Sequence, residues 1–325
     1  MSAVPQTSQS SQSAASKPVY PFLRVIELYL ANIPEWRGGQ PLAQMLKIVA
    51  DGTTNNLRIR FEIKKHSQTT ESPSYIYVYN LSENLRNALA KASGTQQLGG
   101  IELEMKLGWQ NVPLTTVFSG SLLACYSERQ GADIVTTLIS VAAFGAKVEA
   151  VISQTFNAGS SLISMITSLA SQLQHVTIGQ VNVADHKVGN QGWSHAGGAK
   201  DCLDELAKNY RFHHWIDKGI FHACDDTKSL AGSSPPLISF KNGFLMRVEP
   251  ILVGPFQQFG GVTVQSLINP SVLVGGQYQL ESKLNSKLNG VYTASSLNMS
   301  GDSHANQWDM KIESLQPDQT SGPIT

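Results

Sequence analysis

The stretch that decides the fold runs from Leu267 to Leu315 and reads LINPSVLVGGQYQLESKLNSKLNGVYTASSLNMSGDSHANQWDMKIESL. Apolar and polar residues alternate at every second position in QYQLES (277–282), GVYTASSLNM (290–299) and QWDMKIES (307–314). A period of two is typical of half-buried strands rather than helices. The connecting SKLNG and MSGDSHAN are rich in residues that tolerate tight turns. The stretch therefore predicts three strands that serve as a scaffold.

The first part of the chain alternates in the same way. In LRIRFEIKK (57–65) the apolar residues share one face and the charged residues share the other. Further strands are predicted in 22–33, 45–50, 74–82 and 101–110, and two more in 117–142, with a turn through 51–56 joining the second strand to LRIRFEIKK. Ser82 is placed to cap one short helix, SENLRNALAKAS. This pattern predicts a small antiparallel barrel or closed sandwich.

The middle of the chain changes character near Gly145. A strand, KVEAVISQTF, precedes a segment with apolar residues at helical spacing: Leu162, Ile163, Ile166, Leu169 and Leu173. A second helix carries Leu203 and Leu206, and a hairpin follows that turns at Lys218-Gly219. The two strand–Ala-Gly–helix units hint at an internal duplication, although their helices align only with a slip of one residue.

These patterns divide the chain into five parts. We expect a mobile tail at 1–18, a first β domain at 19–130, an α+β middle region at 131–236, a second β domain at 237–316 and a flexible end at 317–325. Pro235-Pro236 marks the end of the middle region, because proline interrupts both helices and strand ladders. The fold class is therefore mainly β, with a mixed α/β region between two β domains.

Composition limits the possible functions. Lys plus Arg and Asp plus Glu each number 24, so the formal charge is zero, and only 15% of residues are charged. Proteins that bind nucleic acid tightly concentrate cations on one face, and this chain offers only short pairs of cations.

The three cysteines have no CxxC spacing and suggest reduced core residues. With no apolar run of about twenty residues and no secretory signal, we expect a soluble protein.

The densest group of ligand-type residues is FHHWIDKGIFHACDD (212–226). In its hairpin, His213 would face Cys224 and His222 would face Trp215, but no fourth metal ligand is evident, so a partly exposed strand face is the preferred interpretation. The sequence also lacks GxSxG, HExxH, GxGxxG and P-loop patterns. We predict no catalytic, cofactor-binding or metal-binding residues. Tyr75, Tyr77 and Tyr79 have no interleaved cations and favour packing over stacking on bases.

The order of several short motifs resembles that of bacteriophage tail hub proteins, also called baseplate hub proteins. The early part of the resemblance lies in LRIRFEIKK and SYIYVYNLSENLRNAL, and the late part runs from a Leu-x-Asn-Pro turn through an Asn-Gly-x-Tyr strand to a Gly-Asp-Ser loop and a Trp strand. Relatives often carry His shortly before the Gly-Asp pair, where this chain has Asn298-Met299-Ser300. The matching signature residues are Phe61, Asn80, Leu81, Asn269, Pro270, Gly290, Tyr292, Gly301, Asp302 and Trp308.

The resemblance implies a structural virion protein of the tail baseplate, assembled in the host cytoplasm and without membrane anchoring. Each chain of a homotrimer would supply two tail-tube-like β-barrel domains, so that three chains build a pseudo-six-fold ring. The ring would join the six-fold tail tube to the three-fold central spike and let DNA pass, with the tape-measure protein and other baseplate proteins as further partners. The alternative is a carbohydrate- or peptidoglycan-binding tail module with weak hydrolase activity, based on Trp193 and Trp215 as exposed aromatic residues.

Overall fold

The structure is a computed structural model, and it describes residues 24–33, 45–51, 56–67, 72–94, 100–110, 112–142, 151–173, 176–189, 192–226, 228–232, 234–255 and 257–315. The predicted tail at 1–18 and the predicted flexible end at 317–325 lie outside these residues. Within them the protein is mainly β, as predicted.

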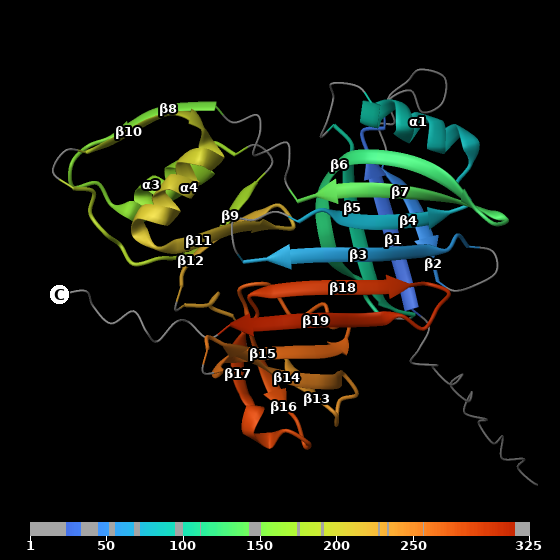
Figure 1. The fold of residues 1–325 in the computed structure, drawn as a ribbon. Helices are drawn as coiled ribbons and strands as arrows, with labels where there is room; N and C mark the ends of the chain where they lie inside the picture. The colour runs from blue at the N-terminus through green and yellow to red at the C-terminus, as the bar shows by residue number, and fades with distance from the viewer. Residues whose placement is uncertain are drawn as a thin grey trace, which may run out of the picture.

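An 11-stranded sheet dominates the molecule and runs in the order β14-β15-β19-β18-β3-β4-β7-β6-β5-β1-β2 (Figure 1). Every neighbouring pair in this sheet is antiparallel. The strands are β1 (Arg24–Ala31), β2 (Leu46–Ala50), β3 (Ile59–His66), β4 (Ser74–Tyr79), β5 (Glu102–Trp109), β6 (Thr115–Gln130), β7 (Asp133–Val141), β14 (Leu245–Val253), β15 (Gln258–Leu267), β18 (Ser296–Asp302) and β19 (Trp308–Leu315).

Alternating residues of these strands form the main core. Ile59, Phe61 and Ile63 of β3 are fully buried, and Met310 and Ile312 of β19 join the same cluster. Helix α1 (Glu83–Gly94) packs Leu85 and Leu89 into this core, so it covers the apolar face of the sheet. The residues between them on β3 and β19 are charged and point to the other face, as the period of two predicts.

The central pairing joins the two ends of the chain. β18 lies antiparallel to β3, with Met299 opposite Ile63 and Gly301 opposite Phe61. The two predicted β domains therefore share one sheet. The predicted pair of closed barrels is not confirmed, because this sheet is open among the described strands, with β14 and β2 at its two edges.

The middle region has a core of its own. A two-stranded sheet pairs β8 (Val151–Phe156) with β10 (Trp193–Gly198), and a three-stranded sheet has the order β11 (Phe212–Asp217), β12 (Ile220–Asp225), β9 (Thr177–Asn182). Helices α3 (Leu162–Ala170) and α4 (Ala199–Tyr210) lie between the two sheets (Figure 1). The predicted helices and the hairpin turn at Lys218-Gly219 are confirmed, since both turn residues have positive φ.

A third, small sheet packs against the main core of the large sheet. Its strands show that one predicted strand is in fact two. It contains β13 (Leu237–Ser239), β16 (Gln277–Glu281) and β17 (Gly290–Thr293), with a 3₁₀ turn at Ser286–Leu288. The stretch GVYTASSLNM was predicted as one strand, but it forms β17 in this sheet and β18 in the large sheet. Between them the N–H of Ala294 donates to the carbonyl of Gly276, and the chain then passes into β18 at Ser296.

A second prediction is also wrong. The turn through 51–56 was expected to join two adjacent strands, but β2 pairs with β1 at the sheet edge, whereas β3 pairs with β4 and β18 in the centre. Residues 52–55 lie outside the described residues. Among the helices that the structure describes, none is long and apolar enough to cross a membrane.

Candidate functional site

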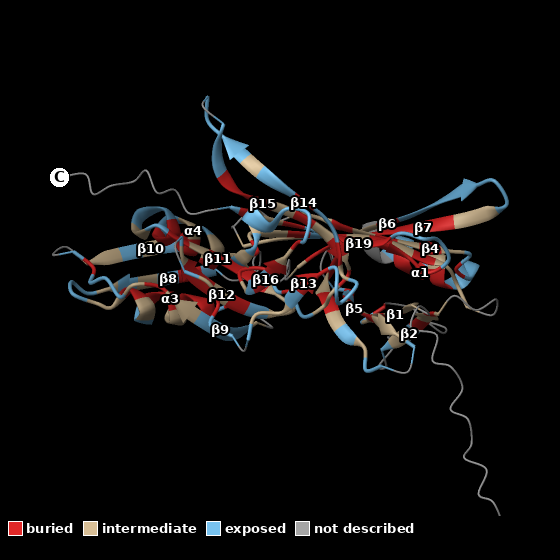
Figure 2. Ribbon diagram, turned by 90° about the horizontal axis from the view of Figure 1, so that it is seen from below, coloured by how far each residue is buried: buried red, intermediate tan, exposed pale blue. Residues whose placement is uncertain are grey.

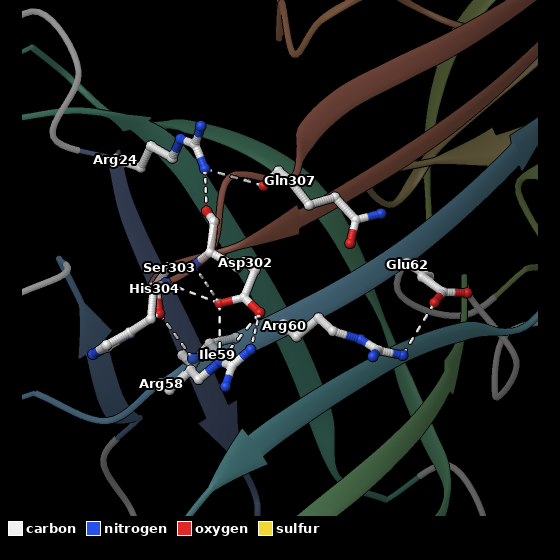
Figure 3. A network of polar contacts seen from close by, with 10 residues as sticks. Arg24, Arg58, Ile59, Arg60, Glu62, Asp302, Ser303, His304 and Gln307 are labelled. Carbon is white, nitrogen blue, oxygen red and sulfur yellow. Dashed lines mark hydrogen bonds and ion pairs between the residues drawn. The ribbon is translucent and has the colours of Figure 1, made fainter.

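An ion pair sits where the two β regions meet. Arg58, just before β3, holds Asp302, at the end of β18, through two guanidinium nitrogens: Nη2 lies 2.6 Å from Oδ2, and Nε lies 3.1 Å from both carboxylate oxygens (Figure 3). The Asp302 side chain is only 2% exposed, whereas Arg58 is 37% exposed. A fork-to-fork geometry of this kind fixes orientation as well as charge.

The same carboxylate orders the loop that follows it. Oδ1 of Asp302 accepts the backbone N–H groups of His304 at 2.8 Å and Ala305 at 3.2 Å. Ser303 bonds Ile59 twice, because its hydroxyl accepts the Ile59 N–H at 3.0 Å and its own N–H donates to the Ile59 carbonyl at 3.0 Å. The start of β3 is thereby tied to the end of β18.

Arg24 of β1 holds the far side of this loop. Its guanidinium donates to the carbonyl of Gln307 at 3.1 Å (Figure 3). It also donates to the carbonyls of Ala305 at 2.6 Å and Asn306 at 3.1 Å. We call Arg24, Arg58, Asp302, Ser303 and His304 the inter-region clamp. It connects β1 and β3 of the first β region to the β18–β19 loop of the second.

Electrostatic interactions favour the ionised forms of Asp302 and Arg58. Burial alone would raise the pKa of Asp302, but the hydrogen bonds from Arg58 and the His304 N–H outweigh it, and the pKa lies below its ordinary value. The hydrogen bond to Asp302 raises the pKa of Arg58. The pair is therefore ionised at neutral pH.

Beneath the clamp, aromatic rings meet around a glycine. Phe61 and Trp308 pack edge to face with ring centroids 5.9 Å apart, and Trp109 lies 6.0 Å from Trp308. A methyl group added at Gly301 would lie 2.7 Å from the Phe61 ring and 2.8 Å from the Trp308 ring. Only glycine lets the two rings approach β18 this closely. Pro270 borders the small apolar pocket beside Trp109 and Trp308.

The remaining signature residues lie in turns and in the small sheet. Asn80 has a positive φ, accepts the Ile134 N–H at 2.9 Å and donates to Asp133 at 2.9 Å, while Leu81 is buried next to it. Asn269 accepts the Ser271 N–H at 3.1 Å and shapes the turn that contains Pro270. Gly290 begins β17, and Tyr292 stacks on Tyr278 at 6.1 Å. The structure thus brings together Phe61, Gly301, Asp302 and Trp308, with Pro270 close by, and leaves the other five apart.

The polar face of the large sheet carries charges in pairs two residues apart on one strand. Arg60 lies 3.3 Å from Glu62 on β3, Lys311 lies 2.6 Å from Glu313 on β19, and Arg247 contacts Glu249 on β14. Residues two apart share a face of a strand, so each pair is visible in the sequence as a cation-x-Glu pattern. Sequence reasoning missed these pairs, and it also missed Arg24 and Arg58.

The tyrosines of β4 lie beside these charges. The guanidinium of Arg58 lies 4.6 Å from the centre of the Tyr79 ring, and that of Arg60 lies 4.4 Å from the Tyr77 ring. The cations that the sequence seemed to lack come from the neighbouring strand β3, not from β4 itself. These contacts hold both arginines close to the tyrosine rings of β4.

The histidines and the cysteine of FHHWIDKGIFHACDD lie on the hairpin formed by β11 and β12. His213 faces Cys224 and His222 faces Trp215, as predicted. His214 bonds Asp204 at 2.9 Å, and the described residues contain no group of three or more His, Cys, Asp or Glu that could hold a metal ion. The three cysteines are buried free thiols, and burial raises the pKa of each one.

Trp215 joins the middle region to the second β region. Its ring is 5% exposed and belongs to the main core, and a Cβ added at Gly275 would lie 2.3 Å from it. Lys65 of β3 also reaches Asp217 of β11, with Nζ and Oδ1 2.5 Å apart and both side chains largely buried. Trp193 is half-buried and stacks on His195 at 5.6 Å. The expectation that Trp215 is exposed was therefore wrong.

The comparisons with solved structures place the fold among tail proteins. A tail protein from Neisseria meningitidis MC58 is similar over 91% of this chain and 97% of its own, with a TM-score of 0.59 and 8% identity. The 43 kDa tail protein of prophage MuSo2 from Shewanella oneidensis is similar over 90% and 98%, with a TM-score of 0.55 and 10% identity. An E. coli component of the type VI secretion system, described as structurally similar to the T4 tail proteins gp27 and gp5, covers 80% of this chain and 73% of its own, with a TM-score of 0.54 and 5% identity.

The fold is thus the one found in phage tail proteins. Curated protein sequences give no match. The family model described as Baseplate hub gp41 matches residues 44–314, which is most of the chain. The chain belongs to this baseplate hub family, which places it in the virion tail. The resemblance inferred from the sequence is confirmed.

Proposed function

We propose that this hub forms a homotrimeric ring that joins the six-fold tail tube to the three-fold central spike. The observation that carries the proposal is the single large sheet to which two β regions, one from each end of the chain, contribute side by side. Two β units per chain, repeated by three-fold symmetry, give six units around one axis. A six-unit side fits the tube, and the three-fold side fits a trimeric spike.

In this proposal residues 19–130 and 237–316 are the two tube-like domains, and residues 131–236 form a middle domain on the outside of the ring. Figure 1 shows the middle region beside the large sheet and not across it. Trp215 and the Lys65–Asp217 pair supply its attachment. The signature residues act as structural residues that hold the β regions in register.

The partners follow from this position. The tail tube protein contacts one side of the ring, the central spike protein contacts the other, and the tape-measure and other baseplate proteins contact the hub during assembly in the host cytoplasm. DNA passes through the ring during ejection. The protein works as a structural component, through its subunit interfaces, and has no catalytic role.

The mass in solution and the shape of the purified protein test this proposal. We expect a trimer by light scattering and a hollow ring with three-fold outline by negative-stain electron microscopy. A protein that stays monomeric at micromolar concentration, alone and with a trimeric spike protein, would contradict it. The variant Asp302→Asn gives a second test, because a loosened clamp should reduce ring formation although the Asp302 side chain is only 2% exposed.

No specific observation favours the alternative of a sugar-binding module. Trp215 is buried in the joint between two regions, and one face of the Trp193 ring is occupied by His195. A binding platform for sugars needs an open aromatic face, and the structure presents neither of these rings in that way.

A further inference from the structure

The small sheet of β13, β16 and β17 carries a hollow on its outer side. Its volume is about 460 Å³, and its lining includes Phe240, Lys241, Gln279, Glu281, Lys283 and Asn289. Figure 1 shows this sheet at the bottom of the view, with helix α1 at the top, and Figure 2 shows β13 and β16 from below. The lining contains no residue of the clamp and none of the joint with the middle region.

Apolar side chains are exposed around this hollow, although the sheet has a well-packed inner side. Leu280 points into the main core and is fully buried. On the outer side, Leu237 and Val291 lie opposite Gln279 in the register of the three strands, and Val291 is 55% exposed. Phe240, directly after β13, is 43% exposed. Exposed apolar side chains that gather around one hollow indicate a contact surface.

The polar groups of the lining are mainly hydrogen-bond donors without an acceptor. Lys241 and Lys283 are exposed, and neither has an ion-pair partner in the described part of the chain. Ser239 and Ser282 are buried and accept backbone N–H groups at 3.3 Å and 3.1 Å, but their hydroxyl hydrogens meet no acceptor among the described residues. Asn289 accepts the Ser282 N–H at 2.7 Å through Oδ1, so its amide nitrogen adds a further donor.

The charge of the lining is also unbalanced. It has two lysines and one carboxylate, that of Glu281, which accepts a hydrogen bond from Gln279 at 3.2 Å. The cations Arg60 and Lys311 of the large sheet, in contrast, are each paired with a glutamate. An occupant that supplies negative charge and hydrogen-bond acceptors therefore complements the hollow.

We propose that this hollow is a docking site for an acidic segment of a partner protein, in which carboxylates alternate with apolar side chains. The carboxylates bind Lys241 and Lys283 and accept hydrogen bonds from the serine hydroxyls, and an apolar side chain packs against Phe240. An anionic membrane surface would meet the lysines but would not reach the buried serine hydroxyls, so a protein segment is favoured. The proposal goes beyond the proposed function and does not rest on it, because the hollow is complete within one chain.

Three short labelled peptides of equal length provide the probes. The first alternates Glu with Leu, the second alternates Lys with Leu, and the third alternates Glu with Ser. We expect the Glu/Leu peptide to bind the unmodified protein at least about tenfold more tightly than either of the others, measured by fluorescence anisotropy, because it alone offers both carboxylates and apolar side chains.

Variants of the lining locate the binding. Lys241→Gln with Lys283→Gln should weaken the Glu/Leu peptide at least about tenfold, because both cations are lost. The matched control is Lys187→Gln with Lys208→Gln, two exposed lysines of the middle region, which changes the net charge equally. We expect the control to change the affinity less than about twofold, because distant charges are screened. Phe240→Ser should reduce the affinity for the Glu/Leu peptide to that for the Glu/Ser peptide.

Several results would overturn the proposal. They are no binding of the Glu/Leu peptide, equal binding of all three peptides, or an equal loss in the lining variant and the control. Binding to phosphatidylcholine vesicles that contain phosphatidylserine, lost in the lining variant without any peptide binding, would assign the surface to a membrane instead. Circular dichroism melts verify that each variant is folded. Light scattering reports ring formation separately, so failure of this proposal and failure of the proposed function are distinguishable.

Discussion

The clamp residue Asp302 provides the sharpest test of the joint between the β regions. Asp302→Asn keeps the size of the side chain but removes the charge that Arg58 contacts at 2.6 Å. Removing one partner of a buried ion pair costs about 3–5 kcal/mol. Arg58 is 37% exposed and regains water when its partner is lost, so the cost lies nearer to that of one charged hydrogen bond, about 1.5–3 kcal/mol. We expect the free energy of unfolding to fall by about 2 kcal/mol.

Urea unfolding followed by far-UV circular dichroism at pH 7 measures the fall in the free energy of unfolding. Faster hydrogen exchange in β18 and β3 than in the unmodified protein would show that the fall arises at the clamp. Asp309→Asn is the control, because Asp309 makes only long contacts, at 3.4 Å to Gln265 and 3.5 Å to Ser300. We expect the control to change stability by less than about 0.5 kcal/mol. An Asp302→Asn protein as stable as the control would refute the role of the clamp.

The pH dependence supplies an independent check on the same pair. The pKa of Asp302 is lower in the folded protein than in the unfolded chain. Its contribution is therefore fully present above the unfolded pKa of about 3.9 and is lost as the pH falls through the folded pKa. We expect the stability difference between the unmodified protein and Asp302→Asn to be constant from pH 7 to about pH 5 and to shrink at lower pH. A difference that grows on acidification would contradict this assignment.

Three further outcomes follow from other contacts. Gly301→Ala should destabilise the protein by about 1–3 kcal/mol in a thermal melt, because its methyl group overlaps two rings, whereas Gly290→Ala, with its nearest contact at 3.6 Å, should change it little. Asp217→Asn should leave Lys65 buried without its carboxylate and loosen the middle region, which limited proteolysis detects as faster cleavage. The buried thiols, with the pKa of Cys125 at about 12, should react with a disulfide reagent at pH 8 only after urea is added, and rapid reaction in buffer would contradict their burial.

Local patterns predicted the elements well. The alternation in LRIRFEIKK and QWDMKIES placed β3 and β19 and their buried faces, and the spacing of Leu162, Ile166 and Leu169 placed α3. The Gly-Asp-Ser loop of the family resemblance also marked Gly301 and Asp302, which lie at the clamp. Each of these signals acts within a few residues along the chain.

Pairing between distant strands could not be predicted in the same way. β3 and β18 are separated by more than two hundred residues, and nothing local in either strand specifies the other as its partner. Arg58 was missed for this reason, since its partner Asp302 lies at the other end of the chain. The split of GVYTASSLNM was hidden as well, because alternation continues through Ala294 although the chain changes sheets there.

The pairing of β18 with β3 has a consequence for synthesis on the ribosome. The central strand β3 has only one neighbour, β4, until residues 296–302 have emerged, so the large sheet stays incomplete until nearly the whole chain has been made. The middle region, with a separate core, reaches its hairpin and helices earlier in translation. The edge of β3 thus stays unpaired during most of synthesis, and it is closed against pairing with other chains only when β18 has been made.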